Sequence, residues 1–458
     1  MPGTSSFHFI AIGGAAMHNL ALALHQHGYH VTGSDDEINE PSRSRLAAAG
    51  LLPAEIGWLP ERIRPELTGV ILGMHARADN PELEAAKRWN IPVYSYPEFL
   101  YEQSKNKTRV VIGGSHGKTT ITSMILHVLR ECGKDFDYMV GAKLDGFDTM
   151  VKISDAPLIV LEGDEYLSSP IDRRPKFHLY HADIGLISGI AWDHINVFPT
   201  FDNYVEQFRI FANAIPASGS LIYCQEDPEV KKVADQSVTS ARKIPYSIPR
   251  HSIENGVTLL DVNGQKIPLQ IFGEHNLMNL EGARCVCELL GIGSTEFYNA
   301  IQSFKGAARR LELLSKNETL SVFKDFAHSP SKLLATTAAV RQQFPNRKLI
   351  ACMELHTFSS LNENFLDEYK GTLELADKAI VYYNPQTIAH KKLPPISSER
   401  VQRAFDKKGL EIYTDAEQLK ADLLAMDTNN AAVLLMSSGT FDGLSLETLA
   451  QTMVSHHS

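Results

Sequence analysis

The sequence predicts an α/β protein whose parallel sheets are divided among two or three domains. Its 458 residues are too many for one ordinary hydrophobic core. One plan also occurs three times: a short strand rich in β-branched residues, then a turn, then an amphipathic helix. Strands that alternate with helices imply parallel sheets joined by right-handed crossovers.

The three copies of this plan begin near residues 7, 109 and 321. The first runs from FHFIAIGG through the helical segment Met17–His27 to the strand HVTGSD. The second runs from RVVIGGSHGK into the helical segment Thr119–Glu131. The third runs from SVFKDFAHSP through a helix near Ser331–Gln343 to the strand KLIACMEL.

Two segments separate the copies and mark domain boundaries. The polar stretch YEQSKNKT precedes the second copy. The segment Lys305–Leu313 precedes the third copy and follows a helix expected over Asn276–Leu290. We therefore expect domains over residues 1–107, 108–311 and 312–458.

Charge, hydropathy and cysteine usage exclude several classes of protein. A net charge of −10 gives no positive field for nucleic acids or anionic membranes. No apolar stretch approaches the roughly 20 residues that span a bilayer, and no signal peptide is evident. The five cysteines form no CxxC pair, and Cys285 and Cys287 lie in an apolar helical run, so reduced core thiols are expected. We expect a cytoplasmic protein, a monomer or weak dimer, that binds neither nucleic acid nor membrane.

The strongest motif is RVVIGGSHGKTTITSMI, in which a strand leads into a glycine-rich loop and then a helix. Glycines let backbone N–H groups turn toward a phosphate, and a helix N-terminus adds positive potential. Lys118 is expected to reach the β- and γ-phosphates, and the Thr119 hydroxyl to bind Mg²⁺. The loop is shorter than usual, because Ile112 stands where the usual loop has its first glycine. The alternative to a nucleotide-binding loop is a structural turn that happens to contain GKT. The predicted nucleotide-binding residues of this motif are Gly114, Ser115, His116, Gly117, Lys118, Thr119 and Thr120.

A second glycine turn, FIAIGGAAMHNLA, follows the first strand and resembles a dinucleotide-binding fingerprint without its third glycine. Gly13 and Gly14 lie at the tight turn. Asp35 ends the next strand at the right distance to accept a hydrogen bond from a ribose. The pattern alone is weak, because a purely structural turn explains it about as well.

Carboxylates follow the apolar strand of LIVLEGDEYLSSP, where Glu162, Asp164 and Glu165 stand at its carboxyl end. After a phosphate loop, this is where an α/β NTPase holds Mg²⁺, and a solvated acidic turn is the alternative. The buried strand of LISGIAWDHINVF ends in Asp193 and His194. We expect His194 to bind metal or phosphate, although a lone histidine is usually structural.

Two further motifs carry polar side chains. FGEHNLMNLEGA opens a helix with His275, Asn276 and Asn279, and amides three residues apart share one face that could hold an adenine edge. A helix cap and a polar helix face explain the same residues. The segments FKGAARRLE and FKDFAHSP add cations near a domain boundary and polar groups at a strand end, namely Arg309, Arg310, Asp325 and His328.

In their order and spacing, the motifs GSHGKTT, LEGDE, WDHINVF, GEHNLMN, GAARRLE and KDFAHSP resemble the Mur ligase family. The N-terminal IGGAAM and GMHARADNPELEAA resemble the branch that recognises UDP-N-acetylmuramate. The resemblance implies a Rossmann-like N-terminal domain that binds the UDP-sugar, a central P-loop ATPase-like domain and a Rossmann-like C-terminal domain. It also implies a cytoplasmic ligase of cell-wall synthesis that uses ATP and Mg²⁺ and forms an amide through an acyl-phosphate.

The resemblance further assigns roles to residues of this sequence. The catalytic residues that it implies are Lys118, Glu162, His194, Arg310 and Asp325. The implied metal ligands are Thr119, Glu162 and His194. The residues implied to bind ATP outside the glycine-rich loop are Asn276 and Asn279 on the adenine, Arg310 on the γ-phosphate and Asp325 near the ribose. The residues implied to bind the other substrates are Gly13, Gly14, Ala15, Met17, Ser34, Asp35, His75, Asn80 and His328.

The identity of the amine stays open between two substrates. The stretch EGDEYLSSPIDRRPKF favours a recycling enzyme whose amine is the tripeptide L-alanyl-γ-D-glutamyl-meso-diaminopimelate, and L-alanine is the alternative. Two departures bear on peptide specificity: Ser329 replaces a family histidine, and MELHTFSSLNENF lacks the expected arginine. A P-loop switch or motor and a non-catalytic nucleotide-binding regulator are remoter alternatives. The switch leaves the N-terminal domain and the Asn276–Asn279 helix unexplained.

Overall fold

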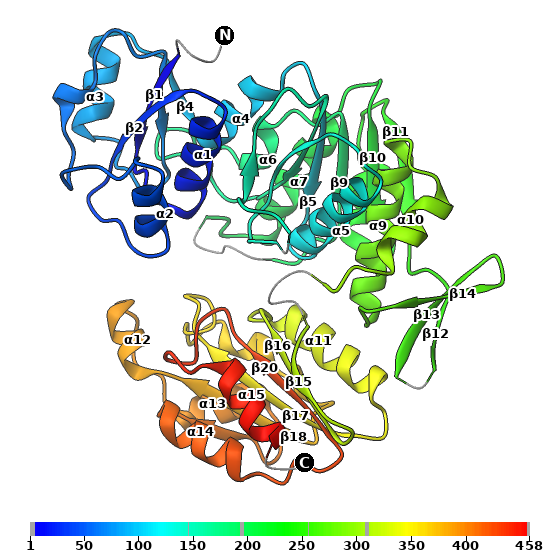
Figure 1. The fold of residues 1–458 in the computed structure, drawn as a ribbon. Coiled ribbons are helices and arrows are strands. Elements are labelled where there is room, and N and C mark those ends of the chain that lie inside the picture. The colour runs from blue at the N-terminus through cyan, green and yellow to red at the C-terminus, as the bar shows by residue number, and fades with distance from the viewer. Residues whose placement is uncertain (1–4, 145, 193–196, 255, 307–310, 456–458) are drawn as a thin grey trace. The chain divides into compact units, whose positions relative to one another are not determined.

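Parallel strands that alternate with helices build the large sheets of the protein, as the computed structural model shows (Figure 1). The structure describes residues 5–144, 146–192, 197–254, 256–306 and 311–455. Contacts within the chain define two compact units. The first consists of Met1–Ser247 with Leu280–Ala300, and the second of Ile248–Asn279 with Ile301–Ser458.

The first sheet belongs to the N-terminal part of the first unit and has the strand order β2-β1-β3-β4, with every pair parallel. Its strands are β1 (Ser6–Ile10), β2 (His30–Ser34), β3 (Gly69–Leu72) and β4 (Val93–Ser95). The accompanying helices are α1 (Ala15–Gln26), α2 (Ser42–Ala48), α3 (Pro81–Arg88) and α4 (Tyr96–Ser104). Ser95 and Glu98 form a capping box that fixes the start of α4.

The second sheet of the first unit has seven strands in the order β11-β10-β9-β5-β8-β6-β7. All its pairs are parallel except β6 with β7. Its strands are β5 (Thr108–Gly113), β6 (Asp137–Met139), β7 (Val151–Lys152), β8 (Leu158–Glu162), β9 (Ile184–Ile187), β10 (Ser220–Cys224) and β11 (Arg242–Tyr246). The helices between them are α5 (Lys118–Glu131), α6 (Lys176–Leu179), α7 (Phe201–Ala214) and α8 (Pro228–Gln236). The helices α9 (Glu274–Leu289) and α10 (Ser294–Ile301) follow later in the chain.

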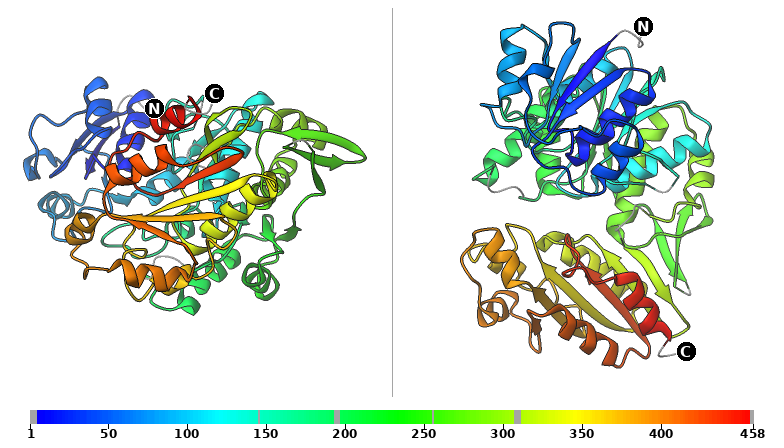
Figure 2. Two further views of the ribbon diagram at one scale, coloured as in Figure 1. Left: turned by 90° about the horizontal axis from the view of Figure 1, so that it is seen from below. Right: turned by 60° about the vertical axis from the view of Figure 1, so that its left-hand side comes forward.

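The second unit contains a six-stranded sheet in the order β15-β16-β20-β17-β18-β19. Figure 2 shows this part of the chain in yellow, orange and red. Its strands are β15 (Glu312–Lys316), β16 (Leu320–Asp325), β17 (Lys348–Leu355), β18 (Lys378–Tyr383), β19 (Glu411–Tyr413) and β20 (Ala431–Met436). Its helices are α11 (Pro330–Gln343), η3 (Leu366–Tyr369), α12 (Pro385–His390), α13 (Ser398–Phe405), α14 (Ala416–Ala425) and α15 (Leu446–Ser455). A small antiparallel sheet, β12 (His251–Glu254), β13 (Val257–Val262) and β14 (Gln265–Leu269), belongs to the same unit.

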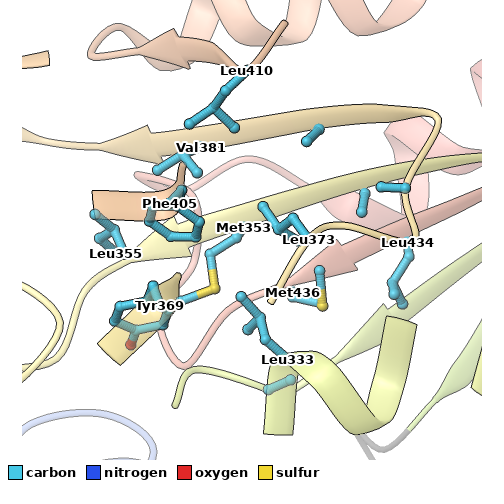
Figure 3. Close-up of a cluster of buried hydrophobic side chains, with 14 of the residues drawn as sticks. Leu333, Met353, Leu355, Tyr369, Leu373, Val381, Phe405, Leu410, Leu434 and Met436 are labelled. Atoms are coloured by element: carbon cyan, nitrogen blue, oxygen red, sulfur yellow. The ribbon is translucent and has the colours of Figure 1, made fainter. Parts of the chain in front are cut away.

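Both faces of the six-stranded sheet are buried, which explains why β17 reads as a continuous apolar run. Leu349, Ala351 and Met353 belong to a core cluster that also takes residues of α11, η3, α12 and α13 (Figure 3). Ile350 and Cys352, which point the other way, belong to a cluster with residues of α14 and α15. Parallel strands covered by helices on both faces need apolar side chains at successive positions.

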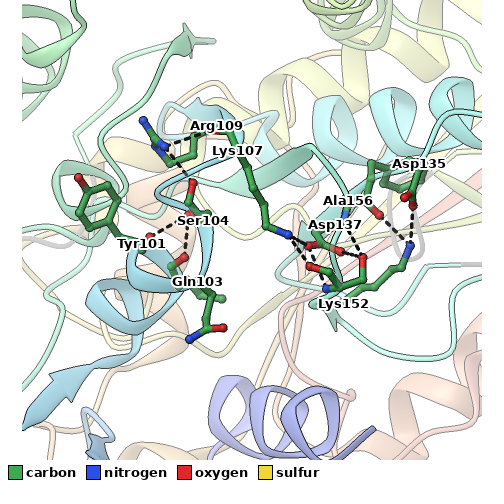
Figure 4. Close-up of polar contacts among 12 residues, drawn as sticks. Tyr101, Gln103, Ser104, Lys107, Arg109, Asp135, Asp137, Lys152 and Ala156 are labelled. Carbon is green, nitrogen blue, oxygen red and sulfur yellow. Dashed lines mark hydrogen bonds and ion pairs between the residues drawn. The ribbon is translucent and has the colours of Figure 1, made fainter. Parts of the chain in front are cut away.

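A polar network fixes the segment that leads into β5 (Figure 4). The Lys107 ammonium lies 2.5 Å from Asp137 Oδ2 and donates to the Ser154 carbonyl at 2.5 Å. The Arg109 guanidinium donates to the Ser104 carbonyl at 2.9 Å and to Asp183 at 3.1 Å. The predicted linker around residue 107 is therefore tied to strands of the seven-stranded sheet.

The predicted α/β class with parallel sheets is confirmed, and the three predicted strand–turn–helix copies appear as β1–α1, β5–α5 and β16–α11. Cys285 and Cys287 are buried and unpaired, as expected. The antiparallel sheet β12–β14 and the antiparallel pairing of β15 with β16 were not predicted. Within the described residues, none of the helices is long and apolar enough to cross a lipid bilayer.

Candidate active site

The glycine-rich loop connects the carboxyl end of β5 to the first turn of α5, as the sequence predicts. β5 lies between β8 and β9 in the sheet, so residues that follow these three strands meet at one edge. Gly114 has a φ of 134°, and a Cβ there would overlap the Ser188 hydroxyl. Glycine is therefore required where the loop passes the end of β9.

Hydrogen bonds to the segment after β9 hold the loop in shape. The Ser115 N–H donates to the Gly189 carbonyl at 3.0 Å, and the Ala191 N–H donates to Ser115 Oγ at 2.8 Å. The Ser188 hydroxyl donates to the His116 carbonyl. These contacts fix the loop backbone, and a fixed backbone is what a loop needs to bind a phosphate through its N–H groups.

Lys118 begins α5 and is held between the loop and a buried carboxylate. Its ammonium donates to the Gly114 carbonyl at 2.5 Å and lies 2.6 Å from Glu165 Oε2. The Tyr204 hydroxyl donates to the other Glu165 oxygen at 2.9 Å. Burial works to lower the pKa of Lys118, but the nearby carboxylates, Glu165 foremost, outweigh it and raise the pKa. Lys118 therefore stays positively charged at neutral pH.

Glu162 ends β8 beside the first turn of α5, where its carboxylate is buried. The Thr119 hydroxyl donates to Glu162 Oε1 at 2.8 Å, and the Gly141 N–H donates to Oε2 at 2.7 Å. A hydroxyl and a carboxylate at this spacing are oxygen ligands of the kind that Mg²⁺ prefers. The two metal ligands predicted at Thr119 and Glu162 are thus brought together, and they fit a Mg²⁺ ion.

Of the other residues predicted to bind metal or phosphate, one forms an ion pair and several lie outside the described residues. The Asp164 carboxylate pairs with Lys176 at 2.6 Å. His194 and Arg310, with their neighbours Asp193 and Arg309, lie outside the described residues. Among the residues that the structure describes, no group of three His, Cys, Asp or Glu side chains gathers as a metal cluster.

The second predicted group of residues lies at the turn after β1. The Gly13 N–H donates to Asp35 Oδ2 at 2.7 Å, and a Cβ on Gly13 would lie 2.9 Å from the same oxygen. Burial raises the pKa of Asp35, although its backbone hydrogen bonds act against this. The N-terminus of α1 begins directly after Gly14, so backbone N–H groups and a carboxylate face one turn.

The remaining residues predicted on the substrate side differ in their surroundings. Met17 and Ser34 are buried, and the Ser34 hydroxyl lies 3.4 Å from His8 Nε2. Ala15 and His75 are exposed. The Asn80 side chain is the N-cap of α3 and accepts from two backbone N–H groups, so it is committed to the helix.

Four predicted residues belong to the second unit. Asn276 and Asn279 lie in α9 as predicted, and the Asn276 amide donates to the Phe272 carbonyl at 2.9 Å. The Asp325 carboxylate accepts from the Leu311 N–H at 2.6 Å and from the Ala327 N–H at 2.7 Å. His328 donates from Nδ1 to the Phe326 carbonyl at 2.7 Å.

Tyr204 and the Gly141 N–H orient the two site carboxylates but were not predicted from the sequence. Neither stands in a recognisable motif, and Tyr204 lies 39 residues beyond Glu165 in the chain. Only the order of strands in the sheet brings them to the loop. No local pattern in the sequence could have identified them.

Three family models match the chain in sequence order. The Mur ligase family catalytic domain matches residues 6–108, the Mur ligase middle domain matches residues 112–303, and the Mur ligase glutamate ligase domain matches residues 309–439. Together they extend over most of the chain and place the glycine-rich loop and Glu162 in the middle domain.

Curated relatives and solved structures match at nearly full length. UDP-N-acetylmuramate–L-alanine ligase of Caldicellulosiruptor bescii is 31% identical over 92% of this chain and 95% of its own. The same enzyme of Aquifex aeolicus is 29% identical over 95% of each chain.

Two crystal structures share the fold. UDP-N-acetylmuramate–alanine ligase of Thermotoga maritima has a TM-score of 0.70 at 20% identity, with 99% of each chain covered. A murein peptide ligase of Psychrobacter arcticus has a TM-score of 0.65 at 22% identity, over 98% of this chain and 99% of the other. From the three family models and these relatives, the chain belongs to the Mur ligase family and is an ATP-dependent ligase that forms carbon–nitrogen bonds.

Proposed function

We propose that this ligase joins the carboxylate of UDP-N-acetylmuramate to an amine through an acyl-phosphate, in peptidoglycan synthesis. The observation that carries the proposal is the cluster of Lys118, Thr119 and Glu162 at one strand edge, in a chain that matches UDP-N-acetylmuramate–L-alanine ligases at nearly full length. The printed names of these relatives support UDP-N-acetylmuramate as the second ligand.

The chemistry needs activation because a carboxylate is a poor acyl donor at neutral pH. ATP supplies the phosphoryl group, and Mg²⁺ held by Thr119 and Glu162 would neutralise its charge. Lys118 is charged and buried beside the loop, so it stabilises the extra negative charge that develops during transfer. The loop N–H groups orient the phosphates. The carboxylate oxygen attacks the γ-phosphorus of ATP and ADP leaves, which gives the acyl-phosphate. The amine then attacks the acyl carbon and gives up a proton to solvent, and phosphate leaves with the electrons of the carbon–oxygen bond.

L-alanine is the amine that the comparisons support better, because the curated relatives described above are L-alanine ligases. The tripeptide L-alanyl-γ-D-glutamyl-meso-diaminopimelate is the second candidate. The stretch EGDEYLSSPIDRRPKF favours it, since this stretch resembles the recycling enzymes rather than the L-alanine ligases.

Phosphate release under steady-state conditions tests the proposal. The reaction should require ATP, UDP-N-acetylmuramate and an amine together, and omission of any one should abolish it. L-alanine and the tripeptide are compared side by side by kcat/KM, and a difference of tenfold, about 1.4 kcal/mol, is decisive. ATP hydrolysis at a rate that depends on neither the UDP-sugar nor the amine would instead indicate a nucleotide switch.

A further inference from the structure

The Glu162 carboxylate is oriented by a backbone group of the segment that joins β6 to β7. The Gly141 N–H donates to Glu162 Oε2 at 2.7 Å, while the Thr119 hydroxyl donates to Oε1 at 2.8 Å. A Cβ on Gly141 would lie 2.9 Å from Oε1, so only glycine lets the backbone approach the carboxylate this closely. Groups that orient a metal-binding carboxylate also set its affinity for the metal. Whatever holds the Gly141 backbone in place therefore acts on the proposed Mg²⁺ site.

The β6–β7 connection, whose described residues are 140–144 and 146–150, holds Gly141 through the other end of the same hairpin. Met139 pairs with Val151 in the antiparallel ladder, and the Val140 N–H donates to the Met150 carbonyl at 3.0 Å. The N–H that contacts Glu162 belongs to the planar peptide group directly after Val140. The position of Met150 therefore determines the position of the Gly141 N–H.

Helix α1 holds Met150 in turn, through the side chain of Asn19. β7 has two residues and is the last strand of the seven-stranded sheet, so it has a strand neighbour on one side only. The Met150 N–H, directly before β7, donates to Asn19 Oδ1 at 3.2 Å. A side chain of a helix thus supplies the acceptor that a neighbouring strand would otherwise provide.

The Asn19 amide has a fixed orientation because both of its ends are bonded. Its nitrogen donates to the Ala15 carbonyl at 2.8 Å, and its oxygen also accepts from the Arg45 guanidinium at 2.9 Å. The side chain is fully buried, so water does not compete for these bonds. Asn19 is therefore a rigid anchor for Met150.

We propose that Asn19 is a positioning residue for the Mg²⁺ carboxylate: it anchors Met150 and so keeps the Gly141 N–H on Glu162. Three hydrogen bonds make the connection, from Asn19 to Met150, from Met150 to Val140 and from Gly141 to Glu162. All of these residues belong to the first compact unit. The inference rests on the proposed function, in which Glu162 holds Mg²⁺. It adds a helix outside the middle domain to the groups that set the affinity for the metal.

Two substitutions of similar size separate this role from simple packing of α1. Asn19→Asp keeps an oxygen that accepts from the Met150 N–H and from Arg45. Asn19→Leu removes that acceptor. Both variants lose the N–H that donates to the Ala15 carbonyl, so the difference between them reports the acceptor alone.

Hydrogen exchange of the ligand-free protein, followed by mass spectrometry, tests the anchor without any turnover. In peptides that cover residues 138–152, the amides of Asn19→Leu should exchange at least about tenfold faster than those of the wild type, and the amides of Asn19→Asp within about twofold. Peptides of β1 should exchange alike in all proteins if the fold is retained. Gln26→Leu replaces an exposed amide at the end of α1 and is the matched control, which should behave as the wild type.

The Mg²⁺ dependence of phosphate release tests the consequence for the metal. Asn19→Leu should raise the Mg²⁺ concentration for half-maximal rate about threefold to tenfold, with kcat at saturating Mg²⁺ within about twofold. Asn19→Asp should restore most of the loss. In a Glu162→Gln background, Asn19→Leu should change the titration less than about twofold, because the carboxylate through which Asn19 acts is gone.

The outcomes separate the inference from the proposed function. Faster exchange together with a raised Mg²⁺ requirement in Asn19→Leu alone supports the positioning role. An unchanged exchange or titration in Asn19→Leu, or equal effects of Asn19→Asp, overturns the role while the ligase activity stands. If the wild type releases no phosphate with UDP-N-acetylmuramate, ATP and either amine, the proposed function fails and the inference fails with it. Asn19→Ala removes the same acceptor and decides the outcome if thermal unfolding shows that Asn19→Leu is misfolded.

Discussion

Lys118 meets two conditions for stabilising phosphoryl transfer: its ammonium is buried, and it stays charged. Its ammonium is buried enough to act at short range, and Glu165 keeps it charged. Glu165 is in turn oriented by Tyr204, so the charge partner of the lysine has a fixed position. Thr119, the next residue, donates to Glu162, so two adjacent residues of α5 contact two different carboxylates.

Lys118→Ala should abolish ATP turnover and leave the fold intact. The loop backbone keeps its contacts with Gly189 and Ala191, while the charge on the transferred phosphoryl group loses its partner. One preorganised contact of this kind contributes roughly 3–4 kcal/mol to a transition state, about 10²- to 10³-fold in rate. The assay is phosphate release, with Lys134→Ala, an exposed lysine beyond the end of the same helix, as control. A variant that retains a tenth of the wild-type rate would falsify the assignment.

Glu162→Gln should raise the Mg²⁺ concentration for half-maximal rate by roughly tenfold or more, because a charged oxygen ligand becomes a neutral amide. The Mg²⁺ titration at saturating ATP measures this. The sequence makes the same prediction for His194→Ala. An unchanged titration for both variants would show that the metal is held elsewhere, with Asp164 and Glu165 as the next candidates.

At the scale of elements, polar contacts tie α1 to α2 and to the segment before β7. The Arg45 guanidinium, from α2, donates to Asn19 Oδ1 at 2.9 Å and lies 3.1 Å from His18 Nε2. The Met150 N–H, beside β7, donates to the same Asn19 oxygen at 3.2 Å. The Gly14 carbonyl lies 3.0 Å from His18 Nδ1 and can only accept, so that nitrogen carries the proton and Nε2 accepts.

His18 should make the folded state sensitive to mild acid. Burial lowers the pKa of His18 below its usual value of about 6.5, and Arg45 acts in the same direction. As the pH falls below 6.5, the unfolded chain takes up a proton that the folded chain does not, so the free energy of unfolding decreases. Urea unfolding at pH 7 and pH 5 should show a smaller loss for His18→Gln than for the wild type. His25→Gln, at an exposed position of α1, should lose as much as the wild type. Equal losses in all three proteins would contradict the prediction.

Met353→Ala tests the packing of β17 against its helices. Met353 is fully buried in the cluster with Leu333 of α11 and Tyr369 of η3 (Figure 3). Truncation of a buried methionine leaves a cavity and costs about 2–5 kcal/mol of stability. Leu375→Ala, at a leucine that is 42% exposed, should cost well under about 1 kcal/mol. The shift of the urea-unfolding transition of this unit measures both, and similar shifts would contradict the assigned packing.

For the whole molecule, the repeated strand–turn–helix elements could be predicted from the sequence. The spacing of hydrophobic residues and the turn residues that define these elements can be read within a short segment of the chain. The KLIACMEL run predicts a strand, and β17 confirms it. The contact of Thr119 with Glu162 follows from two strands that end at one edge. Tyr204 and the Gly141 N–H depend on strand order, which no local pattern encodes. The hairpin of β13 and β14 was missed although the sequence signals it, because Asn263 and Gly264, both at positive φ, form the two-residue turn between the strands.

Oxygen transfer from the carboxylate to phosphate tests the proposed chemistry of the whole enzyme most directly. UDP-N-acetylmuramate labelled with ¹⁸O in its carboxylate is turned over with ATP and the better of the two amines, and the released phosphate is analysed by mass spectrometry. An acyl-phosphate intermediate transfers one carboxylate oxygen, so one ¹⁸O should appear in each phosphate released in a turnover. Phosphate without ¹⁸O, at the same rate of amide formation, would contradict activation of the carboxylate by ATP.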